Sequence, residues 1–542
     1  MSGHNDPEES GWTLLANAIA VLLGVSAAAQ VVAMLARKNL PLLLVIIILG
    51  LLALHNVGHR GHHLVGGRPW RWLRRPPRPL SGDVRWGGLA TLWRAGWIGR
   101  HGCWPVGVYR TLGGVLRVTV RIPEAAATQG TLVLAPTGGG KTDSVLVPIV
   151  RSEARITRPA RRHSLIVLDP KGDVLEKARD ALQATHDVLV WNPAEPHKST
   201  VAIDPLRWIP HSHTDPRYQE ACDNVARAYL AATYSDETGA TSSYVADPYW
   251  QKQVSSVFKG LLLYLKALNA AVTLLDVARY LAEVTPEEMV RHLTTHPRTA
   301  GAELRGASFR ELLLNERARG AVVGDLIERC ALLTDVRLGT VLAPGALPAF
   351  DLDAFLARPT VLALQVGALG DSMLPLLSVV LATIQTELIR RTRGGGRLSR
   401  GVRIIVDEAG VIGRISGLDS GIAMMRSADV GYLIALQATD QLRAAYGKDR
   451  TDTILKNLAH RIALGGTADD DAEWICRNLG KRHAYRDLPG TNGTGEESWH
   501  YTREEWPLLR PDQLRRMRFQ AVVDSSHLPP LRLRLRRDKS PH

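Results

Sequence analysis

Residues 132–148, LVLAPTGGGKTDSVLVP, have the pattern of a phosphate-binding loop between an apolar strand and a helix. Backbone N–H groups of such a loop surround the β-phosphate of a nucleotide, and the dipole of the following helix adds to the attraction. Lys141 is expected to reach the β- and γ-phosphates, and the Thr142 hydroxyl to ligate Mg²⁺. Ala135 replaces the first glycine of the usual pattern but adds only a methyl group. The candidate nucleotide-binding residues are Thr137, Gly138, Gly139, Gly140, Lys141, Thr142 and Asp143.

Hydrolysis needs acidic side chains as well, one to hold Mg²⁺ and one to orient or deprotonate the attacking water. Two acids follow apolar runs, Asp169 in SLIVLDPKGD and Asp407 in RIIVDEAG. We favour Asp407 as the metal ligand because Glu408 follows it and can face the water. Asp169 precedes a Pro-Lys-Gly turn and is expected to shape the neighbouring strand end. The alternative for the loop at 132–148 is a glycine-rich turn that binds no ligand, and the alternative for Asp407 and Glu408 is a solvated turn after a strand.

Two further polar residues are candidates for catalysis. Gln437 ends the run GYLIALQAT and would lie beside the γ-phosphate if its strand neighbours that of Asp407. Arg426 lies between them, in SGIAMMRSADVG. It is either an arginine finger that reaches the ATP of the next subunit or a surface arginine, and spacing does not decide between the two. The catalytic candidates are therefore Glu408, Lys141, Arg426 and Gln437.

The elements that must position these residues read as an α/β domain. Short apolar, β-branched runs without strict alternation are typical of strands buried on both faces, and helical patterns separate several of them. This alternation predicts a mostly parallel sheet with helices on both sides. The expected strands lie in 114–122, 131–136, 164–170, 186–193, 360–367, 402–410, 431–439 and 461–466.

Other segments depart from this alternation. Between about residues 205 and 350 amphipathic helical patterns replace the strands, which predicts an all-α domain inserted at the edge of the sheet. Residues 487–506, rich in Gly, Glu and polar side chains, predict a mobile loop. The alternating tail LRLRLRR, residues 531–537, is either a basic edge strand or a charged terminus.

The first sixty residues predict a membrane anchor. No charged residue occurs in Ser10–Ala36 or between Lys38 and Arg60, and each run is long enough for a membrane-spanning helix. A buried soluble hairpin is the alternative; a cleavable signal peptide is disfavoured because the start is acidic and a second apolar run follows. From His55 to Ile122 twelve Arg face a single acid, Asp83, which predicts a cytoplasmic side here. Both termini are then cytoplasmic.

The overall charge points to a polyanionic partner. The chain has 67 Lys+Arg against 53 Asp+Glu, a net charge of +14, and its 45% hydrophobic content is ordinary for a globular protein. The juxtamembrane arginines are suited to anionic lipid or to DNA phosphates, and the sequence leaves both open. The four cysteines are widely spaced without a C-x-x-C pair, so neither a zinc site nor a disulfide framework is indicated.

Taken in order, these motifs resemble the type IV coupling proteins of bacterial conjugation, the TraG-like ATPases, over nearly the whole chain. The resemblance rests on the two N-terminal spans, residues 81–109, APTGGGKT (135–142), LDPKGD (168–173), VAIDPLRWI (201–209), DPYWQKQV (247–254), VDEAG (406–410), and residues 424–442 and 454–480. Departures are Ala135, Asp204 where asparagine is usual, and Ala438 where serine more often follows the glutamine. The short loop between the spans also departs from relatives that have a sizeable external segment.

The resemblance implies roles for particular residues. Lys141 and Thr142 would bind ATP and Mg²⁺, Asp407 and Glu408 match the second acidic motif, and Asp407 would join Thr142 as a metal ligand. Arg426 matches the inter-subunit arginine of the family, and Gln437 matches its strand-end glutamine.

The implied protein is a hexameric ATPase of the inner membrane that pumps DNA. It would receive a relaxase–single-strand complex and hand it to a type IV secretion channel, with the helical insertion recognising the substrate. The expected domains are a two-helix anchor (1–60, helices about 12–36 and 40–58), a basic connector (61–122), a RecA-like nucleotide-binding domain (123–205 and 351–542) and the all-α insertion (206–350). An ATPase that exports only protein effectors and a non-hydrolysing nucleotide-binding membrane scaffold are the alternatives.

Overall fold

The computed structural model describes residues 84–98, 102–111, 116–234, 248–297, 309–312, 314–343, 345–367, 370–393, 395–491 and 497–536. The chain divides into two units, Met1–Pro79 with Arg110–Arg117, and Leu80–Tyr109 with Val118–His542. The two predicted transmembrane helices lie outside the described residues. Within the described residues one helical stretch, Asp371–Thr392, is long and apolar enough to cross a membrane, but 78% of its most apolar window is buried in the protein.

An eleven-stranded sheet forms the framework, in the order β2-β1-β13-β12-β9-β3-β8-β7-β4-β6-β5. The run from β9 to β5 pairs in parallel, and the β12–β9, β12–β13 and β1–β13 pairs are antiparallel. This confirms the mostly parallel α/β sheet. The strands are β1 (Gly102–Thr111), β2 (Leu116–Pro123), β3 (Thr131–Leu134), β4 (Ser164–Leu168), β5 (Asp187–Trp191), β6 (Thr360–Leu364), β7 (Val402–Val406), β8 (Val430–Leu436), β9 (His460–Leu464), β12 (Gln520–Ser525) and β13 (Leu528–Arg534).

The central parallel strands are buried and mostly apolar because helices cover both of their faces; Arg403 in β7 is a buried charged exception. Every residue of β3, β4, β6, β7 and β8 is buried. Successive side chains enter two separate cores, since Leu132 and Leu134 belong to one cluster and Val133 to the other. One core contains residues of α16 (Leu374–Thr392) and α18 (Leu418–Met424), and the other contains residues of α5 (Val147–Ala154) and α6 (Asp173–Gln183).

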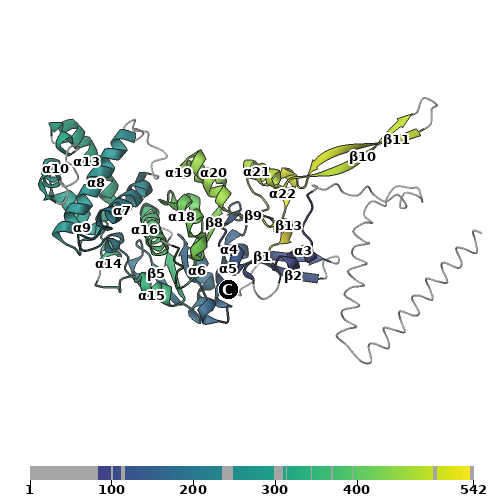
Figure 1. Ribbon diagram of the computed structural model, residues 1–542, viewed down its shortest axis with the longest axis horizontal. Helices are drawn as coiled ribbons and strands as arrows, with labels where there is room; N and C mark the ends of the chain where they lie inside the picture. The colour runs from purple at the N-terminus through teal and green to yellow at the C-terminus, as the bar shows by residue number, and fades with distance from the viewer. Residues whose placement is uncertain are drawn as a thin grey trace, which may run out of the picture. The chain divides into compact units, whose positions relative to one another are not determined.

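The all-helical region connects the two strands at one edge of the sheet, leaving β5 and returning to β6 (Figure 1). Thr273 and Thr285 begin α9 and α10 with capping boxes, which satisfy the first backbone N–H groups of each helix. The helices are α7 (Tyr218–Thr233), α8 (Pro248–Leu268), α9 (Leu274–Glu283), α10 (Pro286–Thr295), α13 (Glu316–Cys330) and α14 (Leu338–Leu342), preceded by the 3₁₀ turn η6 (Pro205–Trp208). The region begins and ends close together, since Ala202 bridges to Ala349.

Two expectations near the C-terminus need correction. Residues 487–491 and 497–506 were expected in a mobile loop, but they belong to β10 (Lys481–Thr491) and β11 (Glu497–Pro507), which pair antiparallel (Figure 1). The alternating tail was expected to be either an edge strand or a charged terminus. Its residues 531–534 do form a strand, but they belong to β13, which lies inside the sheet between β1 and β12. Cross-strand pairing satisfies the backbone in both segments, and single-segment composition does not reveal such pairing.

Candidate nucleotide-binding site

The glycine-rich loop joins β3, a central strand of the sheet, to the helical segment that follows it. Gly138 and Gly140 have φ angles of 70° and 83°, a region that favours glycine. A Cβ atom on Gly139 would lie 2.9 Å from the Pro136 carbonyl oxygen, so a larger residue would force the loop to move. The chain then enters a π-helical turn, η3 (Thr142–Leu146), which continues into α5. Such turns often occur at functional sites.

Lys141 is the centre of the charged cluster at the end of this loop. Its Nζ lies 2.8 Å from Asp407 Oδ1 and 2.7 Å from Glu408 Oε2. The three residues meet because β3, β8 and β7 are consecutive parallel strands, so the carboxyl ends of β3 and β7 lie at the same edge. The structure therefore brings together the phosphate loop and the paired acids that the sequence suggested.

Glu408 has an unusual backbone conformation. Its φ of 59° and ψ of 49° place it in the left-handed region, which non-glycine residues seldom adopt. Such conformations persist where the surrounding structure fixes them, and they are common at active sites. Here the conformation accompanies the contacts of both carboxylate oxygens, Oε2 with Lys141 and Oε1 with the side-chain amide of Gln437.

Gln437 connects the acid pair to the phosphate loop. The Thr137 hydroxyl donates to Gln437 Oε1 at 2.8 Å, and the Gln437 amide nitrogen donates to Glu408. The backbone N–H of Gln437 donates to Gln441 Oε1 at 3.2 Å. Sequence reasoning missed Gln441, which lies in α19 (Thr439–Tyr446); because Gln437 precedes that helix, helical spacing gave no signal for this contact.

The electrostatics of the cluster reflect burial opposed by pairing. Burial acts to lower the pKa of Lys141, but the adjacent Asp407 and Glu408 raise it overall above its ordinary value. Burial raises the pKa of Asp407, and the Lys141 ammonium only partly offsets this. Lys141 therefore stays charged, and the buried environment of Asp407 disfavours a negative charge that has no cation beside it.

The residues at the cluster suit a hard divalent cation. Asp407 Oδ1 is buried and accepts no hydrogen bond of normal geometry from the described residues, although Lys141 Nζ is near it. Thr142 follows Lys141 directly and supplies a hydroxyl at the start of η3. A carboxylate and a hydroxyl at the phosphate loop are the protein oxygens that hold Mg²⁺ in such sites, so Thr142 and Asp407 fit the role.

The other candidate residues are not among the ion-pair partners of Lys141, although Asp169 follows β4, the strand next to β7, and Asp407 contributes to its electrostatics. Asp143 is half exposed and pairs with Lys177 Nζ at 2.7 Å. Asp169 caps the turn before α6, because its carboxylate accepts from the N–H groups of Gly172 and Leu175, and burial raises its pKa to about 7.

Arg426 is exposed in the short turn η10 (Met425–Ala428), which precedes β8, whereas Gln437 follows that strand. The structure does not bring Arg426 to Lys141.

Comparison with solved structures identifies similar folds. An unbound form of the bacterial conjugative coupling protein TrwBdeltaN70 has a TM-score of 0.62 and 16% identity over 88% of this chain and 97% of that chain. TrwB in complex with the ATP analogue ADPNP has a TM-score of 0.58 at 16% identity, covering 88% and 96%. TrwB with ADP and Mg²⁺ has a TM-score of 0.57 at 17% identity, covering 88% and 97%. The sheet and helical region thus have the RecA-type arrangement of TrwB. No curated protein matches the chain in sequence.

The family comparison covers most of the chain. The model of the family described as type IV secretory system conjugative DNA transfer matches residues 100–535, which include the phosphate loop, the paired acids, Arg426 and Gln437. Because the match spans well over half of the sequence, this chain belongs to the type IV secretory system conjugative DNA transfer family.

Proposed function

We propose that this chain is a membrane-anchored ATPase that couples ATP hydrolysis to moving a relaxase–single-strand DNA complex into a type IV secretion channel. The observation that carries the proposal is the convergence of Lys141, Asp407, Glu408 and Gln437 at one edge of three consecutive parallel strands. Family membership supports the DNA cargo. The TrwB complexes with ADPNP and with ADP and Mg²⁺ support ATP and Mg²⁺ as ligands.

The geometry suggests what each residue does. Lys141 would exchange its carboxylate partners for the β- and γ-phosphates, while the loop N–H groups from Thr137 to Thr142 surround the phosphates. Thr142 and Asp407 would hold Mg²⁺, which would neutralise negative charge during phosphoryl transfer. Glu408 would orient the attacking water and accept its proton. Gln437, bonded to both Thr137 and Glu408, would transmit the state of the nucleotide to β8.

Arg426 completes the site only between subunits. It precedes β8 and Gln437 follows it; at roughly 3.3 Å per residue the strand separates them by about 20 Å. An arginine side chain does not span that distance, so Arg426 would serve the nucleotide of a neighbouring subunit. It lines a polar cavity of about 480 Å³ together with Lys456, Arg461 and Asp524, and Asp524 pairs with Arg461 at 2.9 Å. This placement supports a ring, which we take to be a hexamer.

The membrane location rests on the sequence alone. Two uncharged apolar runs and a following arginine-rich segment support two spans, with both termini and the ATPase domain in the cytoplasm. The helical region between β5 and β6 is the proposed substrate-recognition domain.

ATP turnover of the full-length protein in detergent tests the proposal. We expect hydrolysis that rises on addition of single- or double-stranded DNA and is abolished in Glu408→Gln, which keeps the shape of the side chain. Turnover that neither form of DNA stimulates would reject the DNA pump in favour of an exporter of protein effectors. Wild-type protein that binds ATP without any turnover would identify a nucleotide-binding scaffold instead.

A further inference from the structure

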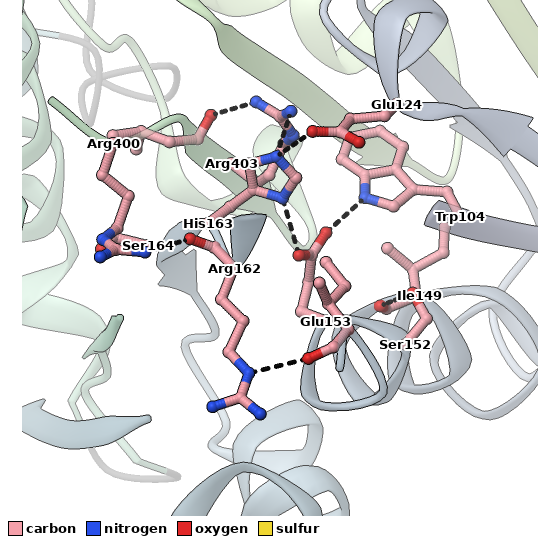
Figure 2. Close-up of polar contacts among 12 residues, drawn as sticks. Trp104, Glu124, Ile149, Ser152, Glu153, Arg162, His163, Ser164, Arg400 and Arg403 are labelled. Atoms are coloured by element: carbon pink, nitrogen blue, oxygen red, sulfur yellow. Dashed lines mark hydrogen bonds and ion pairs between the residues drawn. The ribbon is translucent and has the colours of Figure 1, made fainter. Parts of the chain in front are cut away.

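A buried network of charged side chains lies near the amino ends of β4 and β7, whereas the phosphate loop lies at the carboxyl ends of the parallel strands. Arg403, in β7, is fully buried, and its Nη2 lies 2.8 Å from His163 Nε2 (Figure 2). His163 Nδ1 lies 2.8 Å from the carboxylate of Glu153 in α5, which also accepts from Trp104 Nε1 at 3.3 Å. Figure 2 shows these side chains pointing toward one another from separate elements. Nothing in the proposed hydrolysis mechanism uses this network.

One branch of the network reaches the turn that carries Arg426. Arg403 Nη2 donates to Asp429 Oδ1 at 2.9 Å, and Arg403 Nη1 donates to the Asp429 carbonyl oxygen at 2.8 Å. The same carbonyl accepts from the backbone N–H of Val402 at 3.0 Å. Three hydrogen bonds therefore join Asp429 to β7, one to its carboxylate and two to its carbonyl oxygen.

Asp429 also determines how this turn ends. It follows η10 with φ 63° and ψ 38°, in the left-handed region, and its N–H donates to the Arg426 carbonyl oxygen. Aspartate and asparagine tolerate this conformation better than most residues. The position of Arg426 relative to β7 thus depends on a strained residue, which contacts a guanidinium that is itself held by His163.

We propose that Asp429 is a positioning residue for Arg426, and that its pairing with buried Arg403 fixes the arginine for action on the neighbouring subunit. This inference rests on the proposed role of Arg426 in trans. Arg426 itself is exposed, so within its own subunit the turn is what holds it in place. β7 links the Arg403–Asp429 contact to the proposed catalytic acids, since Arg403 lies near the start of this strand and Asp407 follows its end. The orientation of the arginine is thereby tied to the strand that carries the acids.

Three variants of the full-length protein test the role of Asp429. Asp429→Gly keeps the left-handed backbone accessible but removes the carboxylate, and we expect kcat to fall by about tenfold or more with KM for ATP unchanged. Asp429→Asn keeps an acceptor oxygen and the backbone preference, so its kcat should stay near the wild-type value. Arg426→Ala is measured beside them, with a larger expected loss. Asp215→Gly, which removes a loop aspartate paired with Arg217, is the matched control and should behave like wild type.

Gly401 offers an independent way to disturb the contact between Asp429 and Arg403 without changing a charged residue. A Cβ atom on Gly401 would collide with the Asp429 carboxylate and lie 2.7 Å from His163 Cδ2. Gly401→Ala should therefore displace the carboxylate and lower kcat with little change in KM. It replaces Asp429→Gly as the test if that variant does not fold.

The outcomes separate this inference from the proposed function. Wild-type kcat in Asp429→Gly or Gly401→Ala, together with a strong loss in Arg426→Ala, would overturn the inference and leave the trans arginine standing. Wild-type turnover in Arg426→Ala would reject the trans arginine and, with it, any residue that positions it. A lower melting temperature with a raised KM and unchanged kcat would show that Asp429 only supports the fold.

Discussion

Lys141 has two sets of partners that exclude each other. In the structure its ammonium contacts Asp407 and Glu408, and in the proposed mechanism the same ammonium contacts the phosphates of ATP. If the lysine moved to the phosphates, Asp407 would need another cation, and Mg²⁺ would supply it. Such an exchange would account for a partly buried carboxylate pair beside a lysine. Nucleotide and metal are expected to bind together rather than independently.

Lys141→Ala is expected to abolish ATP turnover and to weaken nucleotide binding, because its ammonium is the cation placed to reach the γ-phosphate. It also leaves two largely buried carboxylates unpaired, which should cost about 1–3 kcal/mol of folding free energy at neutral pH. Burial already raises the pKa of Asp407, and losing the ammonium raises it further. The penalty should therefore shrink as the pH falls and the carboxyl is protonated.

Phosphate release and melting temperature at pH 5 and pH 8 measure both effects. Lys198→Ala removes a lysine from an exposed ion pair with Glu195 and serves as the control. Turnover equal to wild type in Lys141→Ala would reject the assignment of the site.

At this scale the sequence predicted which residues meet but not how they are held. Lys141, Asp407, Glu408 and Gln437 each follow an apolar strand, and parallel strands end at one edge. The left-handed backbone of Glu408 and the pairing of Asp143 with Lys177 were not predictable. Both depend on neighbours that are distant in sequence, such as β8 for Glu408 and α6 for Asp143.

At the scale of elements, Asp204 joins the helical region to the α/β core. One carboxylate oxygen accepts from the N–H of Leu206, in η6, at 2.7 Å. The other accepts from the N–H of Leu274, at the start of α9, at 2.9 Å. Asp204 is buried, and burial raises its pKa to about 7 despite these bonds and the nearby Lys266. The joint between the two regions therefore contains a group that titrates near neutral pH.

This predicts a pH-dependent joint. An aspartate in the unfolded chain has a pKa of about 3.9, so the folded state binds the proton more tightly. The stability that Asp204 contributes is complete below about pH 4 and is lost as the pH rises to about 7. Asp204→Asn cannot ionise. Wild-type protein should therefore lose melting temperature relative to Asp204→Asn between pH 5 and pH 8.

Losing one carboxylate oxygen gives Asp204→Asn an offset that does not depend on pH, so only the change of the difference with pH is informative. Asp351→Asn is the matched control, since Asp351 is an exposed N-cap that accepts from two N–H groups of α15 (Leu352–Ala357). Equal differences at both pH values for Asp204→Asn would show that Asp204 is ionised throughout this range.

The elements were predictable where burial determines them. Strands β3, β4, β6, β7 and β8 are buried on both faces and so read as continuous apolar runs. The β10–β11 pair was not predictable, because its residues are mostly polar and its pairing is visible only once the two strands are aligned. The place of β13 between β1 and β12 was likewise hidden, since a short alternating segment does not indicate its neighbours.

At the scale of the molecule, the two halves of the proposed catalytic site lie at opposite ends of neighbouring strands, one at the carboxyl end of β3 and the other at the amino end of β8. The phosphate loop follows β3, whereas Arg426 precedes β8, which pairs in parallel with β3. A single subunit therefore has a phosphate loop without its arginine and an arginine without a nucleotide. In a ring, each interface would bring the two together. Residue spacing left the inter-subunit role of Arg426 as one of two alternatives, and only the resemblance favoured it, because spacing does not reveal at which end of the strands a residue lies.

Mixing inactive variants tests this arrangement directly. Arg426→Ala subunits keep an intact phosphate loop, and Lys141→Ala subunits keep an intact arginine, so each variant alone should show almost no turnover. When the two are mixed and allowed to assemble, some interfaces pair the loop of the first with the arginine of the second, and ATP turnover should reappear. Mixing Arg426→Ala with the double variant Lys141→Ala/Arg426→Ala provides no intact arginine and should restore nothing. If co-assembly is verified and the first mixture still shows no turnover, Arg426 does not act across the interface.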